Sequence, residues 1–153
     1  MPDTVLDVRL LEGDLDAVAT QGQFMAAHGA AGAVVSFTGV VRGDGGVEAL
    51  YLDWYPGMSE GSLQEIAEAT MARFDVTALT VLHRCAEVRV GEAIVFVAAS
   101  SKHRRAAFEA VDYAMDRLKS EAALWKREIS PEGSRWIEPR VADTDDLKRW
   151  TDE

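Results

Sequence analysis

The chain has 153 residues, 48% of them hydrophobic and 27% charged, which is typical of a soluble globular domain with a sizeable core. The net charge of −10 argues against a nucleic acid or an anionic membrane as the partner, and the single cysteine, Cys85, excludes an internal disulfide or a cysteine-rich metal site. No segment has the length of a membrane span or the pattern of a signal peptide, so we expect a single cytoplasmic domain over residues 1–153.

The first third of the chain predicts three strands and one helix. Residues 5–11 predict a strand, and Asp14 is placed to cap a helix that runs to about His28. Residues 32–41 are rich in β-branched side chains and give the strongest strand prediction, and residues 47–55 predict another strand. Because the G-D-G-G segment between these two strands favours a tight turn, we expect them to pair as a β-hairpin.

The middle of the chain predicts a helix followed by two strands. The helix runs from Ser59 to about Phe74, and its apolar face holds Leu63, Ile66, Ala67 and Met71. Residues 76–86 and 92–99 predict the strands, and Cys85 within the first of them is expected to be a buried, inert thiol. His83 on the same strand is expected to be a satisfied core or surface histidine more often than a ligand.

Residues 101–127 form a basic segment in an acidic protein. They hold seven Lys or Arg against four Asp or Glu, a net charge of +3, which leaves −13 for the rest of the chain. Ser100 and Ser101 are placed to cap a helix here, and the four cationic residues 102–105 follow at once, where the helix dipole favours an anion. The apolar stripe of the helix is expected to comprise Phe108, Val111, Met115 and Leu118. A small anionic ligand fits this segment better than a polyanion does.

Two lysines follow the apolar stripe of this helix. Lys119 lies one turn beyond Met115, and Lys126 lies in the strand-like residues 123–129. Apolar and cationic neighbours lower the pKa of a lysine and make it a usable base or nucleophile. The alternative is that both lysines are solvated charges on an exposed face.

The length of the basic helix limits which residues share a site. His103 and Lys119 are sixteen residues apart, which corresponds to roughly 24 Å along a helix. Two explanations remain open: the two ends serve different sites, or one site takes Lys119 from one subunit and His103 with Arg104 from another. The second explanation predicts a homodimer with a shared pocket.

The remaining residues give weaker signals. Arg42 at the end of a predicted strand is equally compatible with a solvated charge and with a ligand contact. The spacings typical of zinc sites, phosphate loops and nucleophile elbows are missing from the sequence, so we expect neither a metal centre nor a nucleotide. The acidic tail, residues 141–153, either docks as a short helix or stays free. The predicted order, β-α-β-β-α-β-β-α-β, indicates an α+β sandwich in which helices cover a mostly antiparallel sheet.

Five segments together resemble the family of the large, catalytic subunit of molybdopterin synthase. They are F-T-G-V-V-R (37–42), Y-P-G-M-S-E (55–60), H-R-C-A-E-V-R-V-G-E (83–92), S-K-H-R-R-A-A-F-E-A (101–110) and W-K-R-E-I-S-P-E-G-S-R-W-I-E (125–138). The likeness covers about residues 30–140 in unbroken order. It implies an α/β hammerhead-type fold and a homodimer at the centre of a heterotetramer, with a small ubiquitin-like sulfur-carrier subunit at each end.

The resemblance also implies a reaction. The thiocarboxylate at the Gly-Gly C-terminus of the carrier donates sulfur to cyclic pyranopterin monophosphate, and two transfers generate the dithiolene of molybdopterin, without a cofactor. Lys119 and Lys126 correspond to the catalytic lysines. The implied substrate-binding residues are Val40, Val41, Arg42, His103, Arg104, Lys119, Lys126, Arg127, Glu128 and Arg140. Where relatives often carry a lysine, this chain has Val40, which leaves at most backbone contacts from Val40 and Val41.

Two other functions remain compatible with the same residues. One is a non-catalytic module that binds a pterin phosphate or another small anion in the basic pocket. The other is a structural partner that docks a ubiquitin-like protein without binding a pterin.

Overall fold

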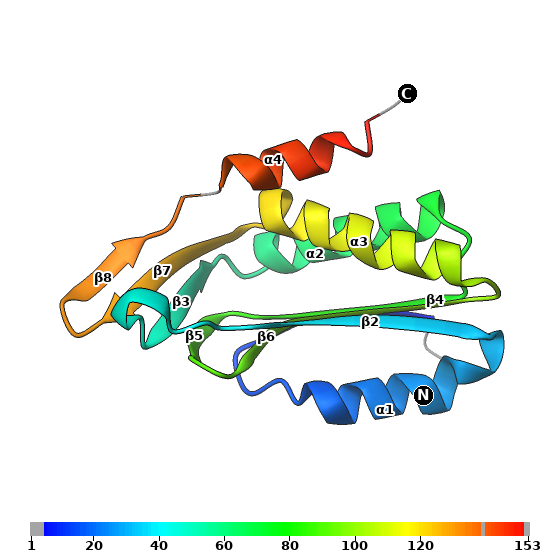
Figure 1. The fold of residues 1–153 in the computed structure, drawn as a ribbon, viewed down its shortest axis with the longest axis horizontal. Coiled ribbons are helices and arrows are strands. Elements are labelled where there is room, and N and C mark those ends of the chain that lie inside the picture. Colours follow the sequence, from blue (N-terminus) through cyan, green and yellow to red (C-terminus); the bar gives the residue numbers. More distant parts are fainter. Residues whose placement is uncertain (1–4, 139, 152–153) are drawn as a thin grey trace.

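The computed structural model describes residues 5–138 and 140–151, which form two four-stranded sheets and four α-helices (Figure 1). In the first sheet the strand order is β1 (Leu6–Leu11), β4 (Ala78–Arg84), β6 (Ala93–Ser101) and β2 (Ala33–Val40). In the second sheet it is β5 (Ala86–Arg89), β3 (Ala49–Trp54), β7 (Leu124–Ser130) and β8 (Gly133–Trp136). Only the β1–β4 pair is parallel among these strands, so the expected α+β class with mostly antiparallel pairing is confirmed.

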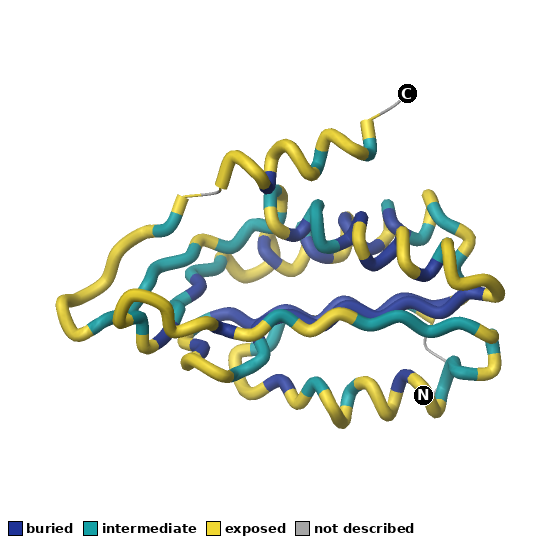
Figure 2. Tube along the Cα trace, in the orientation of Figure 1, coloured by how far each residue is buried: buried dark blue, intermediate teal, exposed yellow. Residues whose placement is uncertain are grey.

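Helices cover both faces of the first sheet (Figure 1). The helices α2 (Met58–Arg73) and α3 (Arg104–Glu121) lie on one face, and α1 (Ala17–His28) lies on the other. Every residue of β4 and all but the first residue of β6 are buried, as the dark trace in Figure 2 shows. A strand covered on both faces needs an almost continuous apolar sequence, which β6 has from Ala93 to Ala99, whereas β4 also buries Thr80, His83 and Arg84.

Small side chains on α3 bring this helix close to the sheet. Ala107, Ala110 and Ala114 have no exposed surface, and Val111 and Leu118 are each 5% exposed. The buried stripe therefore follows the alanines. The expectation that Phe108 belongs to the stripe is wrong, because its side chain is 58% exposed.

The expected hairpin between residues 32–41 and 47–55 is wrong. The two strands, β2 and β3, belong to different sheets, since β2 pairs with β6 whereas β3 pairs with β5 and β7. Between them lies a short 3-10 segment, η2 (Asp44–Gly46), in which two glycines have positive φ angles and turn the chain away. The hairpin of the second sheet is formed instead by β7 and β8.

The single strand expected over residues 76–86 is also divided between the sheets. It ends as β4 at Arg84, and Ala86, with φ of 64°, turns the chain into β5 of the second sheet. The predicted helix caps differ as well, because Asp16 rather than Asp14 accepts the amide hydrogen bond of Ala19 at the start of α1. At the start of α3 the N-cap is His103, and no side chain caps this helix.

The side chains of the two serines predicted to cap α3 form hydrogen bonds with the loop before β4. The hydroxyl of Ser100 lies 2.7 Å from that of Thr77, and the hydroxyl of Ser101 donates to the carbonyl of Asp75 at 2.8 Å. A further short 3-10 segment, η1 (Gly29–Ala31), follows α1.

The acidic tail docks on α3 as a helix, α4 (Val141–Lys148), which resolves the alternative left open by the sequence. Arg149 forms ion pairs with Asp112 and Asp116 of α3. The ring of Trp150 packs edge-on against Phe74 and Tyr113, at centroid distances of 5.8 and 5.4 Å. Within residues 5–138 and 140–151, none of the helices is both long enough and apolar enough to cross a membrane.

We expect Leu63→Ala to lower the free energy of unfolding by about 2–5 kcal/mol, because the fully buried side chain of α2 would leave a cavity beneath α3. The matched control is Val18→Ala on α1, whose side chain is 81% exposed and whose replacement should change stability by less than about 0.5 kcal/mol. Urea denaturation followed by circular dichroism measures both values. Similar losses in the two variants would contradict this description of the core.

Candidate active site

Lys119 and Lys126 lie on either side of one turn. Lys119 is exposed in the last turn of α3, and the chain then passes through Ala122 directly into β7, where Lys126 is half-buried. Two serines of α2 hold the turn in place. The Ser59 hydroxyl donates to the carbonyl of Ala123 at 2.6 Å, and the Ser62 hydroxyl accepts from its amide at 2.9 Å. The proximity of the two lysines therefore follows from the local path of the chain.

The pKa of Lys126 is lowered, as the sequence predicts. Burial lowers the pKa of this amine below its usual range, and the positive charge of Lys119 lowers it further. The negative charge of Asp143 acts in the opposite direction. A lysine with a lowered pKa holds a larger fraction of its neutral amine at neutral pH, as a general base requires.

His83 lies beside the same pair of lysines. It follows Leu79 and Val81 on the face of β4 that packs against α2 and α3, and it is only 6% exposed. Its Nδ1 lies 2.8 Å from the carbonyl oxygen of Arg84, which only accepts, so Nδ1 carries the proton. Burial, assisted by the charges of Lys126 and Lys119, lowers the pKa of His83 to about 4. The expectation of a satisfied core histidine is confirmed, and the imidazole is a neutral neighbour of the lysines.

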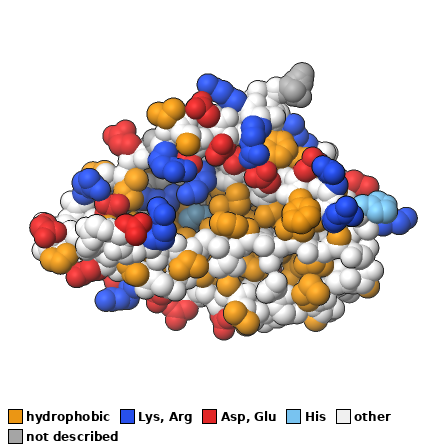
Figure 3. All heavy atoms as spheres, viewed as in Figure 1, with side chains coloured by type: hydrophobic (Ala, Val, Ile, Leu, Met, Phe, Trp, Pro, Cys, Tyr) orange, Lys and Arg blue, Asp and Glu red, His pale blue; other side chains and the backbone are white. Residues whose placement is uncertain are grey.

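Lysine and arginine side chains gather around a hollow on this side of the molecule, and a histidine lies at its floor (Figure 3). Arg140 of the predicted site is the N-cap residue of α4, and its Nη2 donates to Oδ1 of Asp143 at 3.2 Å. Asp143 is 9% exposed, and its backbone carbonyl accepts from the hydroxyl of Ser120, the residue after Lys119. Asp143 was not among the site residues predicted from the sequence, because its burial depends on the docking of α4.

Arg127 and Glu128 are engaged within the second sheet. The guanidinium of Arg127 lies 4.6 Å from the ring centroid of Tyr51 and 5.4 Å from that of Trp136, and its Nε donates to Asp53 at 3.0 Å. The carboxylate of Glu128 accepts from Nη2 of Arg135 at 2.5 Å. Since side chains alternate along a strand, Glu128 shares a face of β7 with Lys126, and Arg127 points to the other face.

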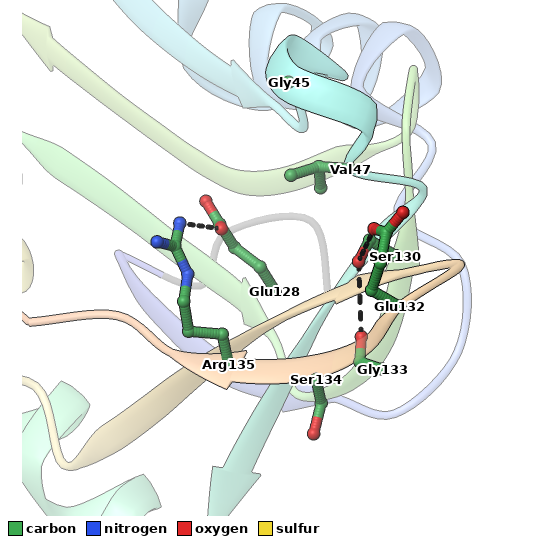
Figure 4. Close-up of a pocket in the computed structure, with 8 residues that line it drawn as sticks. All are labelled: Gly45, Val47, Glu128, Ser130, Glu132, Gly133, Ser134 and Arg135. Atoms are coloured by element: carbon green, nitrogen blue, oxygen red, sulfur yellow. Dashed lines mark hydrogen bonds and ion pairs between the residues drawn. The ribbon is translucent and has the colours of Figure 1, made fainter.

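A polar cavity of about 350 Å³ opens at the far end of this sheet (Figure 4). It lies between η2 and the β7–β8 hairpin and is lined by Gly45, Val47, Glu128, Ser130, Glu132, Gly133, Ser134 and Arg135. Of the predicted site residues only Glu128 lines it, and neither Lys119 nor Lys126 does.

Two of the other predicted binding residues lie far from the lysines within one chain. His103 and Arg104 are exposed at the beginning of α3, at the opposite end of the helix from Lys119 (Figure 1). Arg42 is exposed after β2 and pairs with Asp44 at 3.5 Å. The amide and carbonyl of Val41 bond Glu92 and Gly91, whereas Val40 is 51% exposed. One chain therefore separates the predicted residues into two groups, as the length of the helix requires.

Within the described part of the chain, the acidic residues, histidines and cysteine form no group of three that could hold a metal ion. The thiol of Cys85 is buried, and its pKa is raised to about 11. Burial is the main cause, and the negative charge of Glu12 acts in the same direction. A thiol with so high a pKa is a poor nucleophile at neutral pH, which agrees with the expectation of an inert side chain.

Comparison with known proteins identifies the family. The model described as MoaE protein matches residues 12–121, which is most of the chain. The chain belongs to the MoaE family. The molybdopterin synthase catalytic subunit of Escherichia coli (strain K12) is 50% identical over 123 residues, which cover 78% of this chain and 81% of that protein. The subunit of the same name from Caulobacter vibrioides is 47% identical over 131 residues, covering 85% and 87% of the two chains.

Solved structures of MoaE proteins have the same fold. The protein from Burkholderia ambifaria MC40-6 superposes with a TM-score of 0.80 at 35% sequence identity, covering 97% of this chain and 99% of that one. Molybdopterin synthase from Staphylococcus aureus gives a TM-score of 0.74 at 29% identity, covering 86% and 96% of the two chains. The resemblance found in the sequence is confirmed.

The neutral state of His83 predicts a loss of stability in acid. Because its pKa is about 4 in the folded chain against an ordinary value of 6.5, the unfolded chain takes up a proton below pH 6.5 that the folded chain does not. Between pH 7 and pH 5 this difference lowers the free energy of unfolding by about 2 kcal/mol. Urea denaturation at both pH values should give a smaller pH dependence for His83→Asn than for the parent protein. An equal dependence in the two proteins would contradict the buried, neutral imidazole.

Proposed function

We propose that this chain catalyses the sulfur transfer of a molybdopterin synthase. In this reaction the C-terminal thiocarboxylate of a small ubiquitin-like carrier subunit supplies sulfur to cyclic pyranopterin monophosphate, and two transfers produce the dithiolene of molybdopterin. Membership of the MoaE family supports the reaction class. The observation that carries the proposal is the pair Lys119 and Lys126, which lie on either side of one turn with the pKa of Lys126 lowered.

The two lysines take different parts in this proposal. Lys119 is exposed and meets the incoming thiocarboxylate, either to activate it or to hold the carrier's acyl group transiently as the sulfur leaves. Lys126 is half-buried and assists proton transfer as the cyclic phosphate opens and sulfur adds to the substrate. The difference in burial supports this division, because a lowered pKa favours proton exchange at neutral pH.

Arg42, His103 and Arg104 hold the substrate phosphate in this proposal, with the last two contributed by a second copy of the chain. All three side chains are exposed, as groups that meet an anion must be. β2 is an edge strand of the first sheet, where Phe37 and Val40 are 42% and 51% exposed, and the ring of Phe108 on α3 is 58% exposed. An open strand edge and exposed apolar side chains are typical of a protein interface, which supports the homodimer.

A module that binds a pterin phosphate without reacting is the second candidate. It shares the basic residues and the fold, and it differs in turnover alone. A purified protein that binds the pterin but forms no dithiolene with the thiocarboxylated carrier would favour this candidate.

We expect Lys119→Ala and Lys126→Ala each to reduce the rate of dithiolene formation by on the order of 10²-fold or more, because each removes a group that acts on the reacting atoms. The control is Lys148→Ala, an exposed lysine of α4 that pairs with Asp145 at 3.5 Å. Single-turnover reactions with purified thiocarboxylated carrier give the rates, and thermal unfolding reports whether each variant is folded. Full activity in Lys119→Ala would show that the role assigned to Lys119 is wrong.

A shared site predicts complementation between two inactive variants. A dimer formed by one Lys119→Ala chain and one His103→Ala chain contains one site with both residues intact. Random pairing of co-expressed chains should therefore restore roughly a quarter of the parent activity, although each variant alone is nearly inactive. Sulfur-transfer assays on the co-purified chains measure the recovery. No recovery in dimers shown to contain both chains would contradict a site built across the interface.

A further inference from the structure

The C-terminal helix α4 lies outside the residues matched by the family model, yet it places a buried carboxylate beside the lysine pair. We propose that Asp143 is a positioning residue of the active site, which acts as the counter-charge of Lys119 and Lys126 and thereby sets the protonation state of Lys126. This inference rests on the proposed function and extends it to a residue that has no assigned role.

Contacts at both ends of α4 fix the position of Asp143. At the far end Arg149 pairs with Asp112 and Asp116, and the indole nitrogen of Trp150 donates to Asp116 at 2.6 Å. At the near end the Ser120 hydroxyl donates to the carbonyl of Asp143 at 3.3 Å. Figure 1 shows α4 lying along the C-terminal end of α3. The docking of α4 therefore holds Asp143 next to the end of α3 that carries Lys119.

The carboxylate of Asp143 is charged despite being buried. Burial by itself raises its pKa, but the hydrogen bond from Arg140 and the charges of Lys119 and Arg140 lower it to a net value below the ordinary range. An anion held in this way contributes one negative charge to a site that otherwise contains cations.

The titratable groups around Lys126 come from four elements. The charges of Lys119 on α3 and Asp143 on α4 act on Lys126. The neutral His83 lies on β4, and Glu128 on the same face of β7 is already paired within the second sheet. Burial and Lys119 favour the neutral amine, and only Asp143 favours the ammonium. Removing the carboxylate leaves two influences that act in the same direction, so the titration of Lys126 must move to lower pH.

The sign of this shift is the same for either role of Lys126. If Lys126 acts as a base, the acidic limb of the pH–rate profile moves to lower pH. If it acts as an acid, the alkaline limb moves to lower pH. A purely structural role predicts something different. Asp143 lies in the first turn of α4, where the helix dipole stabilises a negative charge. Loss of this stabilisation alone would lower the free energy of unfolding without moving the titration of Lys126.

The test compares Asp143→Asn with Asp145→Asn, which alters an exposed carboxylate on the same helix that pairs with Lys148. Lysines of the full-length protein are reductively methylated with ¹³C, the Lys126 signal is assigned by its absence in Lys126→Arg, and its NMR titration is recorded. We expect the Lys126 titration to move to lower pH in Asp143→Asn, to stay in place in Asp145→Asn, and to return to the parent position in Asp143→Glu.

A second variant guards against misfolding of the first. Trp150→Ala removes the far anchor of α4 and leaves every charged group of the site in the chain, so it should move the titration in the same direction. If Lys126 titrates as in the parent protein in both Asp143→Asn and Trp150→Ala, or if Asp145→Asn moves it equally, the proposal is overturned. The titration does not require turnover. A shifted titration with an unchanged pH–rate profile would therefore contradict the role proposed for Lys126, and the role proposed for Asp143 would stand.

Discussion

The close packing of α3 on the first sheet determines where the proposed catalytic groups lie. Ala107, Ala110 and Ala114 present almost no side chain to the sheet, so the helix axis comes near the strands and is held in one orientation. One end of the helix then delivers Lys119 to the start of β7, and the other end delivers His103 and Arg104 to a distant surface. A larger residue at any of these alanines would displace both ends together.

Gathering cations at one place costs free energy, and the structure shows where part of that cost is offset. Lys119, Lys126 and Arg140 lie around a single buried carboxylate, and the imidazole of His83 stays neutral instead of adding another charge. The positive charge that remains unbalanced suits a site whose proposed ligands are a phosphate and a thiocarboxylate. Binding these anions would relieve repulsion that the folded chain already contains, which is one physical source of affinity.

The apolar pattern of the sequence is sufficient to predict that α2, α3 and β2 exist, whereas β7 is indicated only by Leu124, Trp125 and Ile129 near its ends. Long-range pairing is not predictable in this way, and the partner of β2 is β6, which follows three other strands and a helix in the chain. The division of residues 76–86 depends on the left-handed conformation of Ala86, a residue type that gives no warning of it. The separation of His103 from Lys119 follows from helix length alone, whereas the lysine pair depends on the turn between α3 and β7. Asp143 was out of reach because its burial depends on docking of the tail.

The second sheet has a consequence for the order in which the molecule is assembled. Ala49 of β3 pairs with Ile129 of β7, so this ladder closes only after most of the chain is available, whereas β4, β5 and β6 are neighbours in sequence. Contacts between distant segments form late, because a long loop must close before they are gained. On a ribosome, β3 would therefore wait with one edge unpaired until the last quarter of the polypeptide has emerged. The segment that carries the proposed catalytic lysines is thus among the last to reach its final structure, and a chain truncated before β7 would lack Lys126.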